Sequence, residues 1–502
     1  MKITNKLGKT LLWATAVIMV FSGCAPKNAE PISTATLPGP EVIISNTETA
    51  VPTPTVLEAT SVTPTEVTFN VPQNRTHYQL ALILNYYTHF GTVTQTITYT
   101  NRTQQSLSEV LLVVPPKYYT DSFILRSLTG GEAEAQLEAR YDGVNMYVQM
   151  QPALELGETT KINLTYQLNF PTREGTFGVS GRQTNLSNWY PYIPPYNEET
   201  GWVFHPQQVE DNMVVGEYVV NEISDFDVTL QLTDREELIE IAASAPGVKK
   251  DGVWSYHLEL ARGFSFSVSD SYVEHEITVD GVRIRSYCFH EHIPAGEAVT
   301  KIAANALKLF GDLYYPYPRE MLSIVVADFV HNMEMDGMVM ISYGVFDFYD
   351  QTPKTNLTIL TPHEVSHQWF YSQVGNDQAT EPWLDEALAT YHEVLYYQQY
   401  HPDLVQWWWD NRISGFSPQG YVNSDIYIAG GYPSYRDAVY LRGAMFIQEI
   451  RDTIGDEAFF AALKDYAITN TYGIANRDNF FDAIAKYSQA DLNLIMNKYF
   501  SN

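Results

Sequence analysis

Apolar and polar residues alternate in short runs from about residue 75 to residue 274. The runs Ile162–Phe170, Phe226–Leu232 and Thr92–Thr100 each place every second side chain on one face, as a half-buried strand does. Dipeptides that favour tight turns separate such runs, among them Asp142-Gly143 and Asp251-Gly252. Many short strands without intervening helices predict an N-terminal antiparallel β-sandwich or saddle-shaped domain over residues 75–274.

The pattern changes after residue 274. A hairpin at Asp280-Gly281 precedes an amphipathic stretch, Ala295–Phe310, whose period is helical, and an apolar strand follows at Leu322–Ala327. The C-terminal tail, Arg442–Phe500, carries apolar residues mainly at helical spacing. Residues 275–502 are therefore expected to form an α+β domain with a mostly helical C-terminal half.

The N-terminus has the composition of an export signal. Three lysines precede the apolar run Leu11–Phe21, which is too short to span a membrane, and small residues then lead to Cys24. This order resembles the lipobox of bacterial lipoproteins and predicts a signal peptide (residues 1–23), lipidation of Cys24 and a membrane-anchored protein outside the cytoplasm. The alternative is a plain secretory signal that is cut near Gly23. The Pro- and Thr-rich residues 24–74 are expected to form a disordered tether.

The chain is strongly acidic, with a formal net charge of −29. Phosphates would be repelled, so the charge argues against a nucleic-acid partner. It also argues against a polybasic membrane contact, which leaves the lipid as the means of attachment. The oligomeric state has no signal in the sequence.

The candidate chemistry begins with His363-Glu364-Val365-Ser366-His367, an H-E-x-x-H sequence in a predicted helix. Residues i and i+4 share one helix face, so both imidazoles can bind one metal ion. Glu364 would then act as the general base on a water that the metal activates. An alternative is that Thr361-Pro362 starts the helix and Glu364 closes a capping box.

A third ligand favours the metal site. Glu386 follows His367 after a gap of eighteen residues and begins another helical stretch. Two antiparallel helices joined by a loop would bring this carboxylate opposite the histidines. Two histidines and one glutamate form the open ligand set of a catalytic zinc ion, one per chain.

These motifs together resemble the aminopeptidase N family of gluzincin zinc metallopeptidases. The segment His363–Phe370, the eighteen-residue gap and Trp383-Leu-Asp-Glu-Ala follow the pattern of that family, with Asp385 and Ala387 as departures from its usual W-L-N-E-G. The resemblance covers residues 75–502 and implies a thermolysin-like catalytic domain. We expect a member that lacks the large C-terminal helical domain of many relatives.

The resemblance implies further roles. Tyr440, in Tyr440-Leu-Arg-Gly, corresponds to the family's tyrosine that stabilises the oxyanion. Glu334 occupies the place of the glutamate that binds the free α-ammonium of the substrate, and its neighbours Asn332 and Met333 would contact substrate. Asp385 is either a group that orients a histidine or a solvated acid at a helix N-terminus.

The resulting hypothesis is a zinc metalloaminopeptidase that acts on peptides outside the cytoplasm. A zinc endopeptidase with an open cleft is the nearest alternative, because only Glu334 supports recognition of a free N-terminus. A non-catalytic surface binding protein is an alternative from another class.

Overall fold

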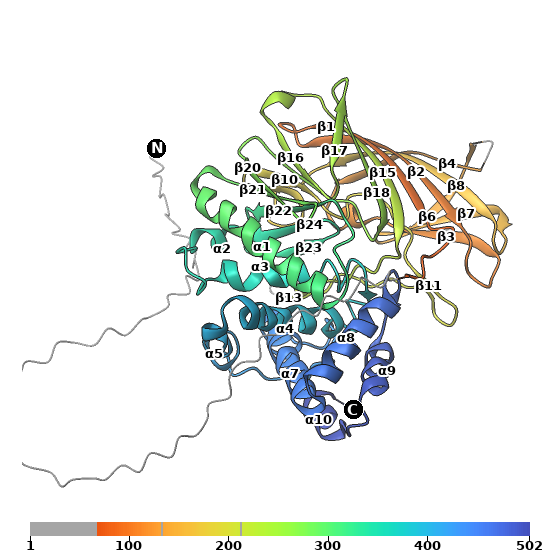
Figure 1. Ribbon diagram of the computed structural model, residues 1–502. Helices are drawn as coiled ribbons and strands as arrows, with labels where there is room; N and C mark the ends of the chain where they lie inside the picture. Colours follow the sequence, from red (N-terminus) through yellow and green to blue (C-terminus); the bar gives the residue numbers. More distant parts are fainter. Residues whose placement is uncertain (1–67, 132–133, 211–212, 502) are drawn as a thin grey trace, which may run out of the picture. The chain divides into compact units, whose positions relative to one another are not determined.

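The computed structural model describes residues 68–131, 134–210 and 213–501, and Figure 1 shows how their helices and strands are arranged. The predicted signal peptide, Cys24 and most of the predicted tether lie outside these residues. Phe69, which falls inside the predicted tether, packs edge-on against Tyr315 with ring centroids 4.9 Å apart. Within the described ranges, no helix combines the length and the apolar composition that a membrane span requires.

The N-terminal region is built on an eight-stranded sheet, in which buried and exposed side chains alternate as the sequence predicts. Neighbouring strands are antiparallel except β1 and β15, which pair in parallel with Leu80 opposite Val228. In spatial order the strands are β17 (Gly247–Lys250), β18 (Val253–Ala261), β15 (Ser224–Leu232), β1 (His77–Asn85), β2 (Phe90–Thr100), β8 (Thr159–Asn169), β4 (Phe123–Gly130) and β5 (Ala135–Gln136).

Two smaller sheets complete this region and share one apolar core with the large sheet, which includes Leu82, Val110 and Trp189. One sheet contains β3 (Leu107–Val113), β7 (Asn145–Leu154) and β6 (Ala139–Asp142), and the other contains β16 (Glu240–Ala243), β19 (Phe266–Ser269), β10 (Gln183–Leu186) and β9 (Phe177–Ser180). Short strand pairs are β11 (Tyr196–Asn197) with β12 (Gly201–Trp202) and β13 (Val209–Glu210) with β14 (Met213–Val214).

A five-stranded mixed sheet begins at Val273 and forms the base of the C-terminal half. Its order is β20 (Val273–Val279), β21 (Val282–Cys288), β22 (Met321–Ala327), β24 (Met338–Ser342) and β23 (Met333–Met335). Helix α1 (Ile293–Leu313) connects β21 to the parallel β22, and α1 and α3 (Asn356–Ser366) pack together against this sheet (Figure 1).

The remaining chain is mostly helical, which confirms the predicted fold class. Trp383, at the start of α4, packs its ring against Phe446, Phe480 and Phe500 and so joins three segments of the tail. The helices are α2 (Tyr343–Asp347), α4 (Trp383–Tyr400), α5 (Val405–Trp408), α6 (Tyr432–Tyr435), α7 (Arg442–Ile454), α8 (Asp456–Asn470), α9 (Arg477–Tyr487) and α10 (Asn493–Tyr499), with π-helical turns at Trp409–Ser414 and Arg436–Leu441 and a strand pair, β25 (Gly375–Asn376) with β26 (Ile474–Ala475).

The capping-box alternative for the H-E-x-x-H sequence is wrong. Helix α3 begins at Asn356, so Thr361 and Pro362 lie inside it, and the Thr361 hydroxyl donates to the carbonyl oxygen of Leu357 one turn earlier. Glu364 therefore does not lie at a helix N-terminus. In a capping box its carboxylate would accept a hydrogen bond from a backbone N–H at that end.

A buried arginine joins the β-rich region to the helical half. The guanidinium of Arg262 donates to four backbone carbonyl oxygens, which belong to Asn221, Tyr371, Gln373 and Gly473. Asn221 precedes β15, whereas the other three acceptors lie in loops of the helical half. Arg262 therefore links the two regions at the segment that precedes β15.

The closest approach between helices α4 and α7 depends on Gly443. A Cβ atom at this position would lie 2.4 Å from the Cβ of Ala387, the residue after Glu386. We expect Gly443→Ala to lower the free energy of unfolding by about 1–3 kcal/mol through overpacking, as measured by urea denaturation.

Gly311→Ala is the matched control, because Gly311 also lies inside a helix and an added Cβ would meet only the Cα of Pro316, at 3.6 Å. This substitution should leave stability unchanged or raise it by roughly 0.5–1 kcal/mol. Equal stability of the two variants would contradict the proposed contact between α4 and α7.

Candidate active site

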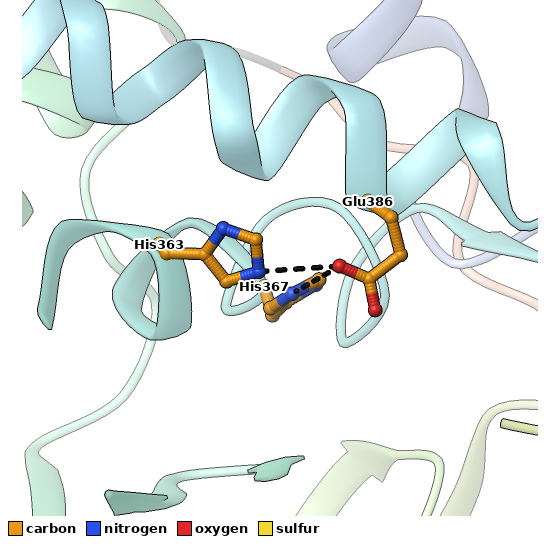
Figure 2. Close-up of side chains that lie close together, drawn as sticks. All are labelled: His363, His367 and Glu386. Atoms are coloured by element: carbon orange, nitrogen blue, oxygen red, sulfur yellow. Dashed lines mark hydrogen bonds and ion pairs between the residues drawn. The ribbon is translucent and has the colours of Figure 1, made fainter. Parts of the chain in front are cut away.

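Helices α3 and α4 bring together the three predicted ligands. His363 lies in the last turn of α3, His367 is the residue that caps this helix, and Glu386 lies in the first turn of α4. Glu386 Oε2 is 3.2 Å from His363 Nε2 and 3.6 Å from His367 Nε2, and Figure 2 shows both imidazoles turned toward this carboxylate. All three side chains are buried.

The other nitrogen of each imidazole already has a partner. His363 Nδ1 lies 3.0 Å from Glu393 Oε1, and His367 Nδ1 lies 3.1 Å from the carbonyl oxygen of Phe370. These acceptors hold the hydrogen on Nδ1 and leave the lone pair of Nε2 facing the centre of the site, which is the arrangement of metal-binding histidines. One ligand atom from each of the three residues lies within 4.8 Å of the others, so the donor set fits a zinc ion.

Behind the ligands, His392 connects the two helices. It is fully buried, its Nδ1 is 2.6 Å from the carbonyl oxygen of Leu388, and its Nε2 is 2.5 Å from the hydroxyl of Tyr314. Burial lowers the pKa of His392 to about 3, so the ring stays neutral and serves as a structural hydrogen-bonding group. The hydroxyl of Ser366, on α3, also lies 3.0 Å from His392 Nδ1.

Glu364 is the residue predicted as the general base, and its side chain is buried beside His363. With the groups of the protein alone, burial raises the pKa of this carboxyl to about 7, and His363 and His367 oppose the rise. A cation held by the neighbouring ligands would favour the carboxylate form further. A carboxylate with a pKa in this range can accept a proton near neutral pH and return it.

Tyr440 lies where the sequence motif predicted it. It belongs to the π-helical turn Arg436–Leu441, and its ring stacks on His363 with centroids 5.8 Å apart and an interplanar angle of 5°. Burial and the negative charges of Glu386 and Glu217 raise its pKa well above the usual value, so the phenol keeps its proton. Tyr440 is thus a hydrogen-bond donor next to the ligand set.

Glu334 lies at the same site, on the edge strand β23, and is buried. Its carboxylate approaches those of Glu386 and Glu217 so that one oxygen of each lies within 4.8 Å of the others. Burial raises the pKa of Glu334 and of Glu217, and Glu386 adds to both shifts by repulsion. A cation between these carboxylates would relieve the repulsion.

Sequence reasoning missed Glu217. This residue lies between β14 and β15 in a segment that has no motif and no regular structure, and only the tertiary fold carries it to the ligands. Tyr435 was also missed: its buried ring lies 5.7 Å from that of Tyr440, and its hydroxyl has no hydrogen-bond partner among the described residues.

Asp385 is not solvated, so that predicted role is wrong, and its hydrogen bonds within the described residues do not join it to a histidine, so the other role is not confirmed. The side chain is buried, with Oδ1 accepting from the backbone N–H of Glu386 and Oδ2 accepting from Gln378 Nε2 at 3.0 Å. The same Gln378 nitrogen donates to Glu334 Oε1 at 2.9 Å. Asp385 therefore braces Glu386 and, through Gln378, Glu334.

Asn332 and Met333 lie beside Glu334. The side-chain oxygen of Asn332 accepts from the backbone N–H of Ser342 at 2.9 Å, and Met333 is half-buried at the start of β23. Asn332 thus fixes the end of the β23–β24 hairpin. Substrate contacts by these two residues stay a prediction.

The C-terminal part of the chain matches a known protein family. Residues 299–499 match the family model described as "Peptidase family M1 domain". This part of the chain is thus similar to an M1 peptidase domain. This confirms the resemblance to the aminopeptidase N family, and together with the donor set it identifies zinc as the cofactor of the site.

Curated relatives match the chain over part of their length. "Aminopeptidase M1" of Arabidopsis thaliana is 26% identical over 244 residues, which are 45% of this chain and 28% of the relative. "Aminopeptidase N" of Lactobacillus helveticus is 27% identical over 304 residues, which are 55% of this chain and 35% of the relative. The chain therefore corresponds to about a third or less of each of these relatives.

One solved structure aligns with this chain over almost the whole length of that structure. The M1 zinc metallopeptidase from Deinococcus radiodurans superimposes with a TM-score of 0.59 at 18% identity and covers 85% of this chain and 94% of its own. The shared fold thus includes the β-rich region before the M1 domain.

The ligand geometry predicts one zinc ion per chain. Adding Zn²⁺ to chelator-stripped protein should raise the free energy of unfolding by about 2.7 kcal/mol when free zinc is a hundredfold above its dissociation constant. Urea denaturation and metal analysis would measure both quantities. His367→Ala should lose the bound zinc, whereas His290→Ala, at an exposed position, should keep it. Stoichiometric zinc in the His367 variant would contradict the assigned site.

Proposed function

We propose that the protein is a zinc-dependent aminopeptidase that releases N-terminal residues from peptides. The observation that carries the proposal is the convergence of Glu217 and Glu334 on the ligand Glu386. A half-buried carboxylate, Glu217, and a buried one, Glu334, beside a metal site provide an anionic subsite for a peptide's free α-ammonium group, which they would bind by charge-assisted hydrogen bonds.

The position of this subsite explains cleavage of a terminal bond. An ammonium held by Glu217 and Glu334 leaves the first peptide carbonyl of the substrate beside the ligand set, because α-nitrogen and carbonyl carbon are separated by only one atom. A substrate with further residues on the N-terminal side of the scissile bond would have no ammonium at this position. The carboxylates of Glu217 and Glu334 would then stay unpaired, at a cost of several kcal/mol.

The chain's own residues then supply the proton transfers. Zinc, when bound, contributes a Lewis acid that polarises the scissile carbonyl and makes water more acidic. Glu364 accepts the proton of the attacking water and passes it to the leaving amine. Tyr440 donates its phenolic hydrogen to the negative charge that develops on the carbonyl oxygen.

Glu364→Gln tests the base. The amide keeps the shape of the side chain but cannot accept the proton, so kcat should fall by roughly 10²–10⁴-fold while one zinc ion stays bound. Tyr440→Phe should lower kcat by about 10²–10³-fold, as the loss of one oxyanion donor does. Hydrolysis of an aminoacyl fluorogenic substrate, with metal analysis of each variant, would measure this. Full activity of Glu364→Gln would remove this residue from the mechanism.

A free N-terminus should be required. A peptide with a free amine should be hydrolysed at least about tenfold faster than its N-acetylated form, since one lost charge pair costs 1.4 kcal/mol or more. Glu217→Gln should raise KM for the free peptide with a smaller change in kcat and should reduce this preference.

Glu222→Gln is the matched control, because Glu222 lies in the same segment but pairs with Arg102 at the surface. This variant should leave KM and kcat unchanged. If the wild-type protein hydrolyses the free and the acetylated peptide at equal rates, the aminopeptidase hypothesis is wrong and an endopeptidase is favoured. If the purified protein contains no zinc, a non-catalytic binding protein is favoured.

A further inference from the structure

The imidazole of His363 is held by a carboxylate that is itself fully enclosed. Glu393 lies two turns after Glu386 on α4, and its side chain is 0% exposed. Its Oε1 is the 3.0 Å partner of His363 Nδ1. A carboxylate without access to water needs other donors, because an unpaired buried charge costs several kcal/mol.

Arg412 supplies most of these donors. Its Nε lies 3.0 Å from Glu393 Oε2 and its Nη2 lies 3.0 Å from Oε1. The guanidinium thus forms a bidentate, fork-like pair with the carboxylate. Trp408 adds a third donor, with Nε1 at 3.1 Å from Oε2. Oε1 thus serves His363 and Arg412 together, while Oε2 serves Arg412 and Trp408.

This arrangement fixes the carboxylate in three dimensions. A fork fixes the plane of the carboxylate, and the indole N–H on the far oxygen prevents it from turning about its long axis. Trp408 ends α5, and Arg412 lies in the π-helical turn Trp409–Ser414 that continues it. Wider turns of this kind inside helices occur often at functional sites. Here the turn aims two donors, four residues apart in the chain, at one acceptor.

We propose that Arg412 and Trp408 are positioning residues for the zinc ligand His363, acting through Glu393. They hold the carboxylate where it fixes the hydrogen on Nδ1 and the plane of the ring, so that Nε2 points at the metal position. The inference rests on the zinc-dependent function proposed above but concerns metal affinity, which can be measured without substrate.

Arg412→Met removes the fork and keeps an unbranched apolar side chain. The zinc dissociation constant, measured by competition with a chromophoric chelator, should rise about 10–100-fold, the effect of losing support for a metal-binding histidine. Trp408→Phe keeps a ring and removes only the N–H, so its constant should rise in the same direction by less. Arg412→Lys should restore part of the affinity, because an ammonium replaces the charge but not the fork.

Arg451→Met is the matched control. Arg451 is as enclosed as Arg412, with 12% of its side chain exposed against 15%, and it also contacts α4, through Tyr391 and Gln398, but it does not reach Glu393. Its loss should lower stability and leave the zinc dissociation constant within about twofold of wild type. Circular dichroism would establish that each variant is folded.

An unchanged zinc constant in folded Arg412→Met, or in Trp408→Phe if the arginine variant does not fold, would overturn the inference while wild-type zinc binding and hydrolysis stand. A matching loss of zinc affinity in Arg451→Met would also overturn it, because the effect would then come from general loosening of α4. Absence of zinc binding by the wild-type protein would instead overturn the proposed function itself.

Discussion

Mutual repulsion among closely spaced carboxylates is the constraint on which the site depends. One oxygen from each of Glu217, Glu334 and Glu386 lies within 4.8 Å of the others, and Glu334 and Glu386 are buried while Glu217 is half-buried. Carboxylates at such distances cannot all stay ionised without compensating positive charge. Zinc at the histidines would provide part of that charge, and in the proposed function the α-ammonium of a peptide would provide the rest, so metal binding and recognition of the chain end would be electrostatically coupled.

Both regions of the fold contribute residues to the site. Helices α3 and α4 carry the ligands, the base and Glu393, and the hydroxyl of Ser366 on α3 lies 3.0 Å from Nδ1 of His392 on α4, which links the two helices. The β-rich region contributes Glu217, which is useful only if its segment is held against the helices. Without that region the helical half would keep its three metal ligands but lose the carboxylate of Glu217.

The sequence predicted the parts of the site that depend on local spacing. His363, His367 and Glu386 follow from helical periodicity and a fixed gap, and Tyr440 and Glu334 follow from motifs that resemble those of the family. Glu393 could have been found, because it lies seven residues after Glu386 and hence on the same helix face. Glu217, Gln378 and Arg412 could not, because their places depend on loop paths and on a π-helical turn. For the same reason the alternation along β1 and β15 predicted two strands but not that they pair in parallel.

The joint between the two regions has a consequence for the conditions in which the protein keeps its structure. Arg262 binds Asn221, Tyr371, Gln373 and Gly473 only through their peptide carbonyl oxygens. Peptide carbonyls neither titrate nor attract dissolved counter-ions as carboxylates do, and a buried contact is only weakly screened by salt. The Arg262 contact should therefore hold at high salt as in dilute buffer, whereas the ion pair His205–Asp377, which also joins the two regions, should weaken as salt rises.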